Sequence, residues 1–438
     1  MPYVVTQSCC SDASCVVACP VNCIHPAPGE PGFGQAEMLH IDASTCVGCG
    51  ACVTACPAGA IVPDVVLSEE ERPFEALAAE YYDTFPHADR TPVALVPRQR
   101  RLRRRGPFRV AVVGAGPSGL YAADELLKHP EVAVDVIDRR EAPHGLVRYG
   151  VAPDHERTRE VARLLEAIAR QPGFRYRLGL DVGRDVSHEQ LAGEYDAVVH
   201  ATGASADRRL DVPGADLPGV VGATALARWS NGDPDLPDLE LPPAGSRVVV
   251  VGAGNVALDM ARLLTGPLVG ARQVVVLGRR GADVAAFTTP ELIGLAGLRD
   301  VDVLLDGDPP AGTGVRARLL ADLARRVPRE GRPRIVLKFH APVAEVVGTT
   351  RASGVRLADG TALDADLVVT AIGHEWTTVE HDRGRVRPGL YVVGWAKRGP
   401  SGFIGTNKSC AEETVAMLLD DLDAGVPERR RDAVSRIR

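Results

Sequence analysis

The chain has 438 residues, of which 45% are hydrophobic, and carries a formal net charge of −7. This length predicts about two or three domains, and the negative charge argues against a general nucleic-acid binder. Because no apolar run approaches the roughly 18 residues of a membrane helix, and because the N-terminus lacks a signal-peptide core, we expect a cytoplasmic protein without membrane insertion.

Residues 1–66 form a cysteine-rich and turn-rich segment. It contains nine of the ten cysteines, several acidic residues and neither Lys nor Arg. In a chain of this size, such a density of cysteines indicates metal or redox chemistry rather than disulfides.

One run in this segment, Cys46-x2-Cys49-x2-Cys52-x3-Cys56-Pro57, has the ligand spacing of bacterial ferredoxins. The first three thiolates wrap one iron–sulfur cluster, and the fourth cysteine is carried away to ligate another cluster. A structural zinc site would normally show two cysteine pairs separated by a longer loop. The run therefore predicts iron–sulfur clusters.

An incomplete copy precedes this run: Cys9 or Cys10, followed by Cys15-x3-Cys19-Pro20, with the middle cysteine missing. The exchange of fourth ligands predicts two sites: a 4Fe–4S cluster bound by Cys19, Cys46, Cys49 and Cys52, and a second cluster bound by Cys9, Cys15 and Cys56. Three thiolates suit a 3Fe–4S cluster. Cys10 could supply a fourth ligand for a second 4Fe–4S cluster, but small buried residues beside the metal are the simpler interpretation of Cys10 and Cys23.

Residues 67–106 begin with an acidic, helix-compatible stretch and end in an arginine-rich strip at 98–105. We expect a linker or docking segment here. Our hypothesis is that the acidic N-terminal segment docks on a basic face of the rest of the chain, using Arg98–Arg105.

From residue 107 the pattern becomes strands alternating with helices. A strand at Val110–Val113, a helix at Leu120–Lys128 and a strand at Val132–Ile137 are followed later by an equivalent set at 247–251, 255–264 and 273–277. Such βαβ repetition predicts parallel sheets. The expected fold is α/β, with an N-terminal α+β ferredoxin domain (1–66) followed by two Rossmann-like nucleotide-binding domains, the first formed by 107–208 and 366–438 and the second by 209–365.

The first expected nucleotide site is the glycine turn after the strand at 110–113. Gly114, Gly116 and Gly119 form a Gly-x-Gly-x-x-Gly motif, and Asp138 ends the next strand. The glycines permit the tight turn, the approach of a pyrophosphate and close packing of helix and strand, and the carboxylate can accept hydrogen bonds from ribose hydroxyls. The phosphate is expected at the helix N-terminus.

The second site repeats this motif at Gly252-Ala253-Gly254-Asn255-Val256-Ala257. After the following strand, Arg279 and Arg280 stand where an NAD site would carry an acid. Two guanidinium groups can bind a 2′-phosphate, so the pattern favours NADP over NAD.

Four separated stretches carry a family resemblance: 145–155 (GLVRYGVAPDH), 254–259 (GNVALD), 278–281 (GRRG) and 394–402 (GWAKRGPSG). Through them, residues 107–438 resemble the adrenodoxin-reductase type of ferredoxin–NADP reductase along nearly their whole length. The whole chain resembles the actinobacterial fusion of a seven-iron ferredoxin to such a reductase, although the Cys9-to-Cys15 gap is shorter than in seven-iron ferredoxins. That departure leaves the type of the first cluster open.

The resemblance implies cofactor contacts and catalytic residues. The implied FAD contacts are Ser118, Asp138, Leu146, Val182, Trp395, Gly402, Phe403 and Ile404. The implied NADP contacts are Ala253, Gly254, Asn255, Val256, Arg279, Arg280, Glu291 and Gly402. His155 and Asp259 are implied to lie near the flavin and to help proton movement; a purely structural histidine is the alternative.

The activity implied is hydride transfer between NADPH and FAD, then one-electron transfer to the fused clusters and on to an external ferredoxin or a cytochrome P450 chain. A disulfide oxidoreductase would need a redox cysteine pair near the flavin, but the reductase part has only Cys410. A flavin monooxygenase would have no use for the cysteine-rich segment. A non-catalytic NADP and iron–sulfur redox sensor is the remaining alternative, and steady NADPH-dependent turnover separates it from an enzyme.

Overall fold

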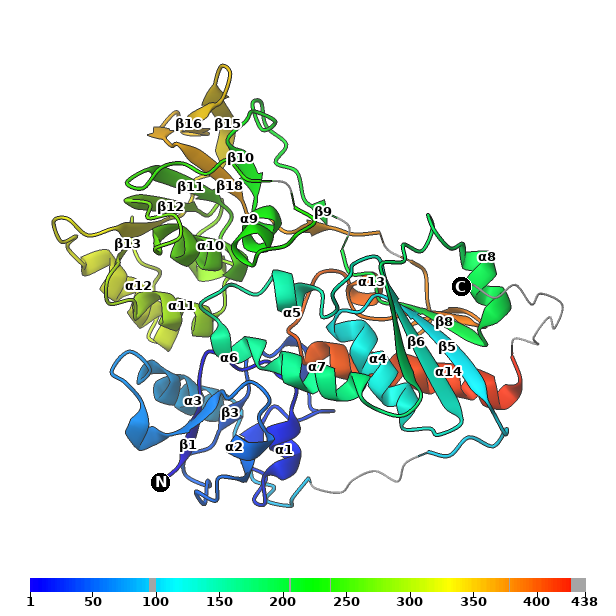
Figure 1. Cartoon of the computed structure of the whole chain (residues 1–438). Helices are drawn as coiled ribbons and strands as arrows, with labels where there is room; N and C mark the ends of the chain where they lie inside the picture. Colours follow the sequence, from blue (N-terminus) through cyan, green and yellow to red (C-terminus); the bar gives the residue numbers. More distant parts are fainter. Residues whose placement is uncertain (94–99, 205, 237, 378, 427–438) are drawn as a thin grey trace.

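The computed structural model of the protein describes residues 1–93, 100–204, 206–236, 238–377 and 379–426. Three parts pack together (Figure 1): a cysteine-rich head formed by residues 1–66, a first unit built on one six-stranded sheet, and a second unit built on another. In Figure 1 the head, in blue, lies against both units. Among the described residues, none of the helices has the length and apolar character needed to cross a membrane.

The head consists of short elements between its cysteines. These are β1 (Tyr3–Val5), α1 (Ser14–Ala18), β2 (Ile24–His25), η1 (Phe33–Gln35), β3 (His40–Ile41), α2 (Ala51–Ala55), β4 (Ile61–Pro63) and η2 (Asp64–Val66). Strands β1 and β4 pair antiparallel, as do β2 and β3, and α1 packs against α2. This is the α+β arrangement expected for the segment.

The segment after the head contains a packed helix, α3 (Pro73–Thr84). Its first residue is a proline, which suits the first helical position because the missing N–H has no partner there. The helix contacts β1 and β3 of the head on one side and helices of the second unit on the other. Part of the expected linker is therefore a rigid spacer between the two.

The first unit has the sheet order β20-β21-β8-β5-β6-β7. Its elements are β5 (Phe108–Val113), α4 (Pro117–Leu127), β6 (Val132–Asp138), α5 (Leu146–Tyr149), α6 (Glu156–Arg159), α7 (Val161–Ala169), β7 (Phe174–Leu178), α8 (His188–Glu194), β8 (Ala197–His200), β20 (Arg385–Arg387), β21 (Leu390–Val392), α13 (Trp395–Arg398) and α14 (Thr406–Ala424). The central strand β5 is almost entirely buried, as expected for a parallel strand covered on both faces. Helix α14 packs on α4.

The second unit has the all-parallel order β10-β18-β11-β12-β14-β13. Its elements are β10 (Val220–Gly222), α9 (Ala223–Ser230), β11 (Arg247–Val251), α10 (Asn255–Thr265), β12 (Gln273–Leu277), η3 (Ala282–Val284), α11 (Thr289–Ala296), β13 (Asp302–Asp306), α12 (Val315–Arg325), β14 (Arg334–Lys338), β15 (Val343–Gly348), β16 (Ala352–Leu357), β17 (Ala362–Asp364) and β18 (Leu367–Thr370). Strands β15, β16 and β17 form a separate antiparallel sheet. The short pair β9 (Ala206–Asp207) and β19 (His374–Glu375) connects the two units.

Two boundaries differ from the sequence expectation. The helix expected at Leu120–Lys128 begins at Pro117, directly after the glycine turn. Strand β18 pairs in parallel with β10 and β11, so the chain remains in the second unit beyond residue 365, where we expected it to leave. The chain returns to the first unit only after β18, because β18 lies between β10 and β11 and pairs with both.

Candidate functional site

The second cysteine motif and Cys19 surround one pocket in the head. Its lining includes Cys19, Cys46, Cys49 and Cys52, the four residues expected to bind a 4Fe–4S cluster. Cys23 also lines this pocket, and its backbone N–H donates to Cys19 Sγ at 3.4 Å. All ten cysteines, each within the described residues, are free thiols. The donor set and its shape therefore fit a cluster rather than a disulfide framework.

The other expected ligands, Cys9, Cys15 and Cys56, lie close enough for their charges to interact. Cys15 is buried, and burial together with the charges of Cys9, Asp12 and Cys56 raises the pKa of its thiol well above the usual value. Several thiolates can exist together in such a place only when a metal compensates their charge. Cys10 is buried in the core of the first unit, against which the expected ligand Cys56 also packs.

The glycine turn of the first unit is shaped to receive a dinucleotide. An added Cβ at Gly114, whose φ is +115°, would lie 2.4 Å from the Ala201 carbonyl oxygen, so only glycine permits this turn. An added Cβ at Gly116 would meet nothing within 4 Å, and the backbone there is open for an anion. Gly119, in α4, packs its Cα against the Gly114 carbonyl.

A cleft of about 1220 Å³ opens at the carboxyl ends of β5, β6 and β8, where ligands bind in parallel sheets. Its lining includes Gly114, Asp138 and Val182. Asp138 accepts the backbone N–H of Ala115 at 2.7 Å, which fixes the carboxylate beside the turn. The size and position of the cleft fit FAD.

The remaining expected FAD residues, all within the described part of the chain, are not among those that line this cleft. Leu146 is 40% exposed although it is a large apolar residue. The preceding residue, Gly145, lies close to Gly116, because an added Cβ at Gly145 would be 3.2 Å from the Gly116 Cα. Trp395 begins α13 and packs against the His374 ring, with ring centroids 5.2 Å apart. Gly402, Phe403 and Ile404 lead into α14. The Ser118 hydroxyl donates to Asn407 Oδ1 at 2.8 Å.

The second glycine turn begins helix α10. Ala253 and Gly254 precede the helix, Asn255 Oδ1 accepts the Thr288 N–H at 2.7 Å, and Val256 is 41% exposed. Arg279 and Arg280 follow β12 and are exposed. Neither guanidinium forms an ion pair within the described part of the chain, so both are available for a phosphate.

His155 and Asp259 meet in a partly buried ionic cluster between the two units. His155 Nε2 lies 3.1 Å from Asp259 Oδ1. The buried Arg262 contacts both, and also Asp154 at 2.7 Å and Glu291 at 3.2 Å. Burial acts to lower the pKa of His155, but the hydrogen bond and charge of Asp259 raise it overall. Burial, followed by the charge of Asp259, raises the pKa of Glu291.

Glu291, expected as an NADP contact, is therefore held inside this cluster. It also accepts a 2.8 Å hydrogen bond from the side-chain amide of Gln7 in the head. Sequence patterns do not reveal the roles of Arg262 and Gln7, because both roles depend on segments that meet only in the fold.

The head docks on both units through contacts that the sequence did not indicate. Glu37 accepts the Thr289 N–H at 2.9 Å at the start of α11, and the Gly405 N–H donates to the Cys10 carbonyl at 2.8 Å at the start of α14. An added Cβ at Gly405 would lie 2.3 Å from the Asp12 backbone nitrogen, so the contact is close. Ile293 and Val315 of the second unit extend the apolar core of the head.

The expected docking through Arg98–Arg105 is not what the structure shows. Residues 98 and 99 lie outside the described residues. Arg100 forms ion pairs with Asp420 at 2.7 Å and Asp423 at 2.8 Å on α14, and Arg104 donates to the Leu422 carbonyl. The described part of the strip therefore fastens the chain to the first unit, because α14 presents carboxylates there.

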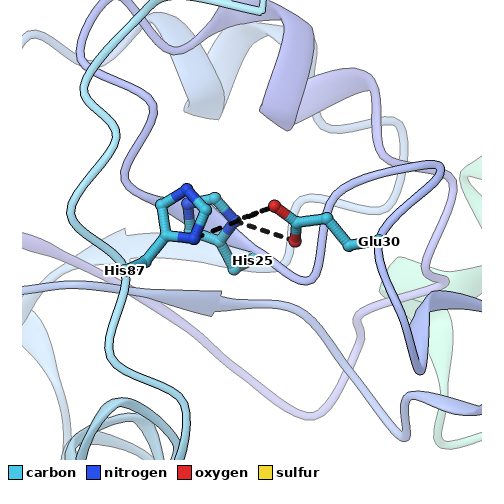
Figure 2. Close-up of side chains that lie close together, drawn as sticks. All are labelled: His25, Glu30 and His87. Atoms are coloured by element: carbon cyan, nitrogen blue, oxygen red, sulfur yellow. Dashed lines mark hydrogen bonds and ion pairs between the residues drawn. The ribbon is translucent and has the colours of Figure 1, made fainter.

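A further polar cluster fastens the segment after α3 to the head (Figure 2). His25 Nδ1 lies 3.0 Å from Glu30, and its Nε2 donates to the Asn22 carbonyl at 3.0 Å. The His87 ring packs on the His25 ring with centroids 3.6 Å apart, and its Nδ1 lies 3.9 Å from Glu30. The three donor atoms are close enough to share a cation. Burial acts to raise the pKa of Glu30, but the Ala27 N–H and His25 lower it overall.

Comparison with known proteins agrees with this architecture. A family model described as pyridine nucleotide-disulphide oxidoreductase matches residues 108–387, and a 4Fe-4S binding domain model matches residues 39–62. A Mycobacterium leprae protein named probable ferredoxin/ferredoxin–NADP reductase is 42% identical, over 97% of this chain and 87% of its own length.

Two further similarities concern the reductase part. A mitochondrial NADPH:adrenodoxin oxidoreductase of Arabidopsis thaliana is 31% identical, over 73% of this chain and 83% of its own length. The structure of Mycobacterium tuberculosis FprA in complex with NADPH superposes with a TM-score of 0.67 at 35% identity, covering 73% of this chain and 85% of that one.

Proposed function

The chain belongs to the family of ferredoxin–NADP reductases that carry their own ferredoxin domain, and from this membership we propose that it oxidises NADPH at a bound FAD and delivers single electrons to clusters in its head. FAD, when bound, supplies the conversion between the paired electrons of a hydride and the single electrons that iron–sulfur clusters carry. The residues of the chain bind, orient and separate these groups.

Each cofactor has a place in the proposal. The turn at Gly114–Gly119 and Asp138 bind FAD, with Leu146, Val182, Ser118, Trp395 and residues 402–404 around it. The turn at 253–256 binds NADP, and Arg279 and Arg280 bind its 2′-phosphate. The domains are 1–66, the spacer 67–106, and the two nucleotide-binding units, with the last boundary placed after β18 rather than at residue 365.

The observation that carries the proposal is the contact between the Gly405 N–H and the Cys10 carbonyl, at 2.8 Å. Gly405 directly follows the expected FAD segment 402–404, and Cys10 directly follows a ligand of the first cluster. The residues that would hold the first cluster therefore lie beside residues that would bind FAD. The second motif lies further out, and its Cys49 is exposed. We propose that electrons pass from the first cluster to the second and leave near Cys49.

The second cluster is 4Fe–4S in this proposal. The first, with three cysteines, is 3Fe–4S unless another ligand makes it a second 4Fe–4S cluster. The acceptor beyond Cys49 is an external ferredoxin or a cytochrome P450 chain. A surface thiolate-bound cluster suits a transient protein partner, since such electron-transfer contacts are small.

His155 and Asp259 have a supporting role in the proposal. Asp259 raises the pKa of His155, and Arg262 offsets the carboxylates of Asp259 and Glu291 so that the cluster is stable. A protonated imidazole at this junction can exchange a proton as charge arrives and leaves beside it.

Anaerobic rapid mixing of the holoprotein with NADPH tests the function. We expect loss of flavin absorbance first, followed by electron paramagnetic resonance signals of reduced clusters in freeze-quenched samples. Steady NADPH-dependent reduction of cytochrome c should accompany this. A protein whose flavin is reduced while both clusters stay oxidised on the turnover timescale, or which binds NADPH without turnover, would contradict the proposal.

A further inference from the structure

The two cysteine motifs of the head share one spacing when Asp12 is counted. Cys9-x2-Asp12-x2-Cys15-x3-Cys19-Pro20 has the same intervals as Cys46-x2-Cys49-x2-Cys52-x3-Cys56-Pro57. Asp12 therefore occupies the position that Cys49 occupies in the complete motif. By the same alignment Cys10 corresponds to Val47, which is not a ligand position.

The backbone repeats along with the spacing. Ser11 has φ 55° where Gly48 has 68°, and Ala13 has φ 61° where Gly50 has 76°. Each loop then enters a five-residue helix, α1 or α2, which ends at a cysteine in extended conformation. Non-glycine residues adopt positive φ at a cost, which persists only where the surrounding structure requires that shape. The first loop thus keeps the cluster-wrapping conformation without the glycines that make it easy.

The side chain of Asp12 is buried without a cation. It is 8% exposed, and no basic side chain in the described residues pairs with it. Its carboxylate accepts the Ser14 hydroxyl at 2.5 Å and the Ser14 N–H at 3.3 Å. An ionised carboxylate is costly to bury with only these partners, and it retains lone pairs for a metal ion. Hydrogen bonds from Ser14 would orient it as metal-binding carboxylates are usually oriented.

We propose that the Asp12 carboxylate is the fourth protein ligand of the first cluster, completing a 4Fe–4S cluster with Cys9, Cys15 and Cys56. This inference rests on the proposed two-cluster function. Carboxylate oxygen is a harder donor than thiolate, so the iron at this corner is the one most readily lost. Oxidative loss balances as 4Fe–4S (2+) giving 3Fe–4S (1+), one Fe2+ and one electron, which an added oxidant such as ferricyanide accepts.

Cys10 is not this ligand. Its side chain is 4% exposed and packs in the core of the first unit, and its carbonyl is engaged by the Gly405 N–H. Turning its thiol to the cluster would open that core. Asp12, in contrast, already occupies the loop position from which the complete motif presents a ligand.

Anaerobic iron and sulfide analysis with electron paramagnetic resonance tests the assignment on the full holoprotein. For the unmodified protein reconstituted with iron we expect about eight irons per chain, conversion by ferricyanide to the near-isotropic signal of an oxidised three-iron cluster, and reversal by Fe2+ with dithionite. Asp12→Asn and Asp12→Ala should show the three-iron signal without added ferricyanide and should contain one iron fewer per chain than the unmodified protein. Fe2+ with dithionite should not restore their four-iron cluster. Asp12→Cys should resist ferricyanide.

Asp42→Asn is a matched control, because Asp42 also accepts the N–H and hydroxyl of a serine two residues on, Ser44, but lies outside the ligand spacing. It should keep the response of the unmodified protein. Equal behaviour of Asp12→Ala and the unmodified protein would overturn the assignment while leaving a two-cluster reductase intact. A chain that binds no cluster at all would instead contradict the proposed function.

Discussion

The side-chain amide of Gln7 donates a 2.8 Å hydrogen bond to the carboxylate of Glu291, which lies 284 residues further along the chain. Glu291 also contacts Arg262, and through it the pair formed by His155 and Asp259. A residue of the head is thus part of the ionic cluster at the junction of the two nucleotide-binding units. The docking of the head and the environment of His155 are therefore physically connected.

Replacing Gln7 should slow electron delivery to the head. Gln7→Ala removes a hydrogen bond to a charged group, worth about 1.5–3 kcal/mol, and Gln7→Glu adds a like charge beside Glu291. We expect slower cluster reduction after NADPH mixing, with Gln7→Glu the slower of the two, and little change in the rate of flavin reduction. Stopped-flow absorbance separates the two steps. Gln35→Ala, an exposed head residue, is the control; an equal effect there would refute the connection.

Asp259→Asn should change the pH dependence of the enzyme. The pKa of His155 is raised because the interactions with Asp259 outweigh burial. Since the folded pKa lies above the unfolded one, this stabilisation is fully present below the unfolded pKa and is lost as pH rises through the folded pKa. Without Asp259 the folded pKa of His155 should fall, so the variant should lose this stabilisation at a lower pH than the unmodified protein does. The alkaline decline in the rate of NADPH oxidation should shift to lower pH in the same way. Unchanged thermal unfolding and rate profiles between pH 6 and 9 would contradict this expectation.

Many of the candidate site residues could be predicted from the sequence, because they belong to motifs with short, fixed spacings. The glycine turns, Asp138, the arginine pair after β12 and the ferredoxin ligand intervals each depend on residues close together in the chain. Arg262, Gln7 and Gly405 could not be assigned, since their roles depend on partners more than a hundred residues away or in another unit. The position of β18 and the pairing of Arg100 with α14 were missed for the same reason.

Arg279 and Arg280 should determine the preference for NADPH over NADH. Replacing both with Ala removes charge-assisted bonds of about 1.5–3 kcal/mol, which raises the KM for NADPH roughly 10- to 100-fold while the KM for NADH changes little. Steady-state ferricyanide reduction with each nucleotide measures this. Arg272→Ala is the matched control, because Arg272 is an exposed arginine before β12 whose backbone forms hydrogen bonds with Ser246 and Arg334. Loss of activity with both nucleotides would point to a folding defect instead.

Gly405→Ala should separate the head from the first unit. The new Cβ would lie 2.3 Å from the Asp12 backbone nitrogen, and overpacking of this kind costs about 1–3 kcal/mol. Flavin content and flavin reduction should be retained, whereas cluster reduction by NADPH should slow. Gly34→Ala, where an added Cβ meets nothing within 4 Å, provides the comparison in the head. Normal cluster reduction in Gly405→Ala would exclude this contact from the electron path.

The cluster of His25, Glu30 and His87 should protect the segment after α3 from proteolysis. His87→Ala removes the ring that packs on His25, so trypsin should cleave faster after Arg90. Because the folded pKa of Glu30 is depressed, its contribution is present above its unfolded pKa and is lost as pH falls through the folded pKa. Hydrogen exchange of residues 85–93 should therefore rise as the pH falls below about 4.3, the ordinary pKa of a glutamate, and His87→Ala should abolish that rise.

The head contacts the first unit at Gly405 and the second unit at Thr289 and Glu291. The two units are joined to each other by the short strand pair β9–β19, and a rotation about that pair would break one set of head contacts. In a reductase whose electron acceptor is a separate protein, such a rotation would break no contacts with the acceptor. Here the head bridges both units, so a mutation that eases a rotation of one unit against the other should also loosen the head.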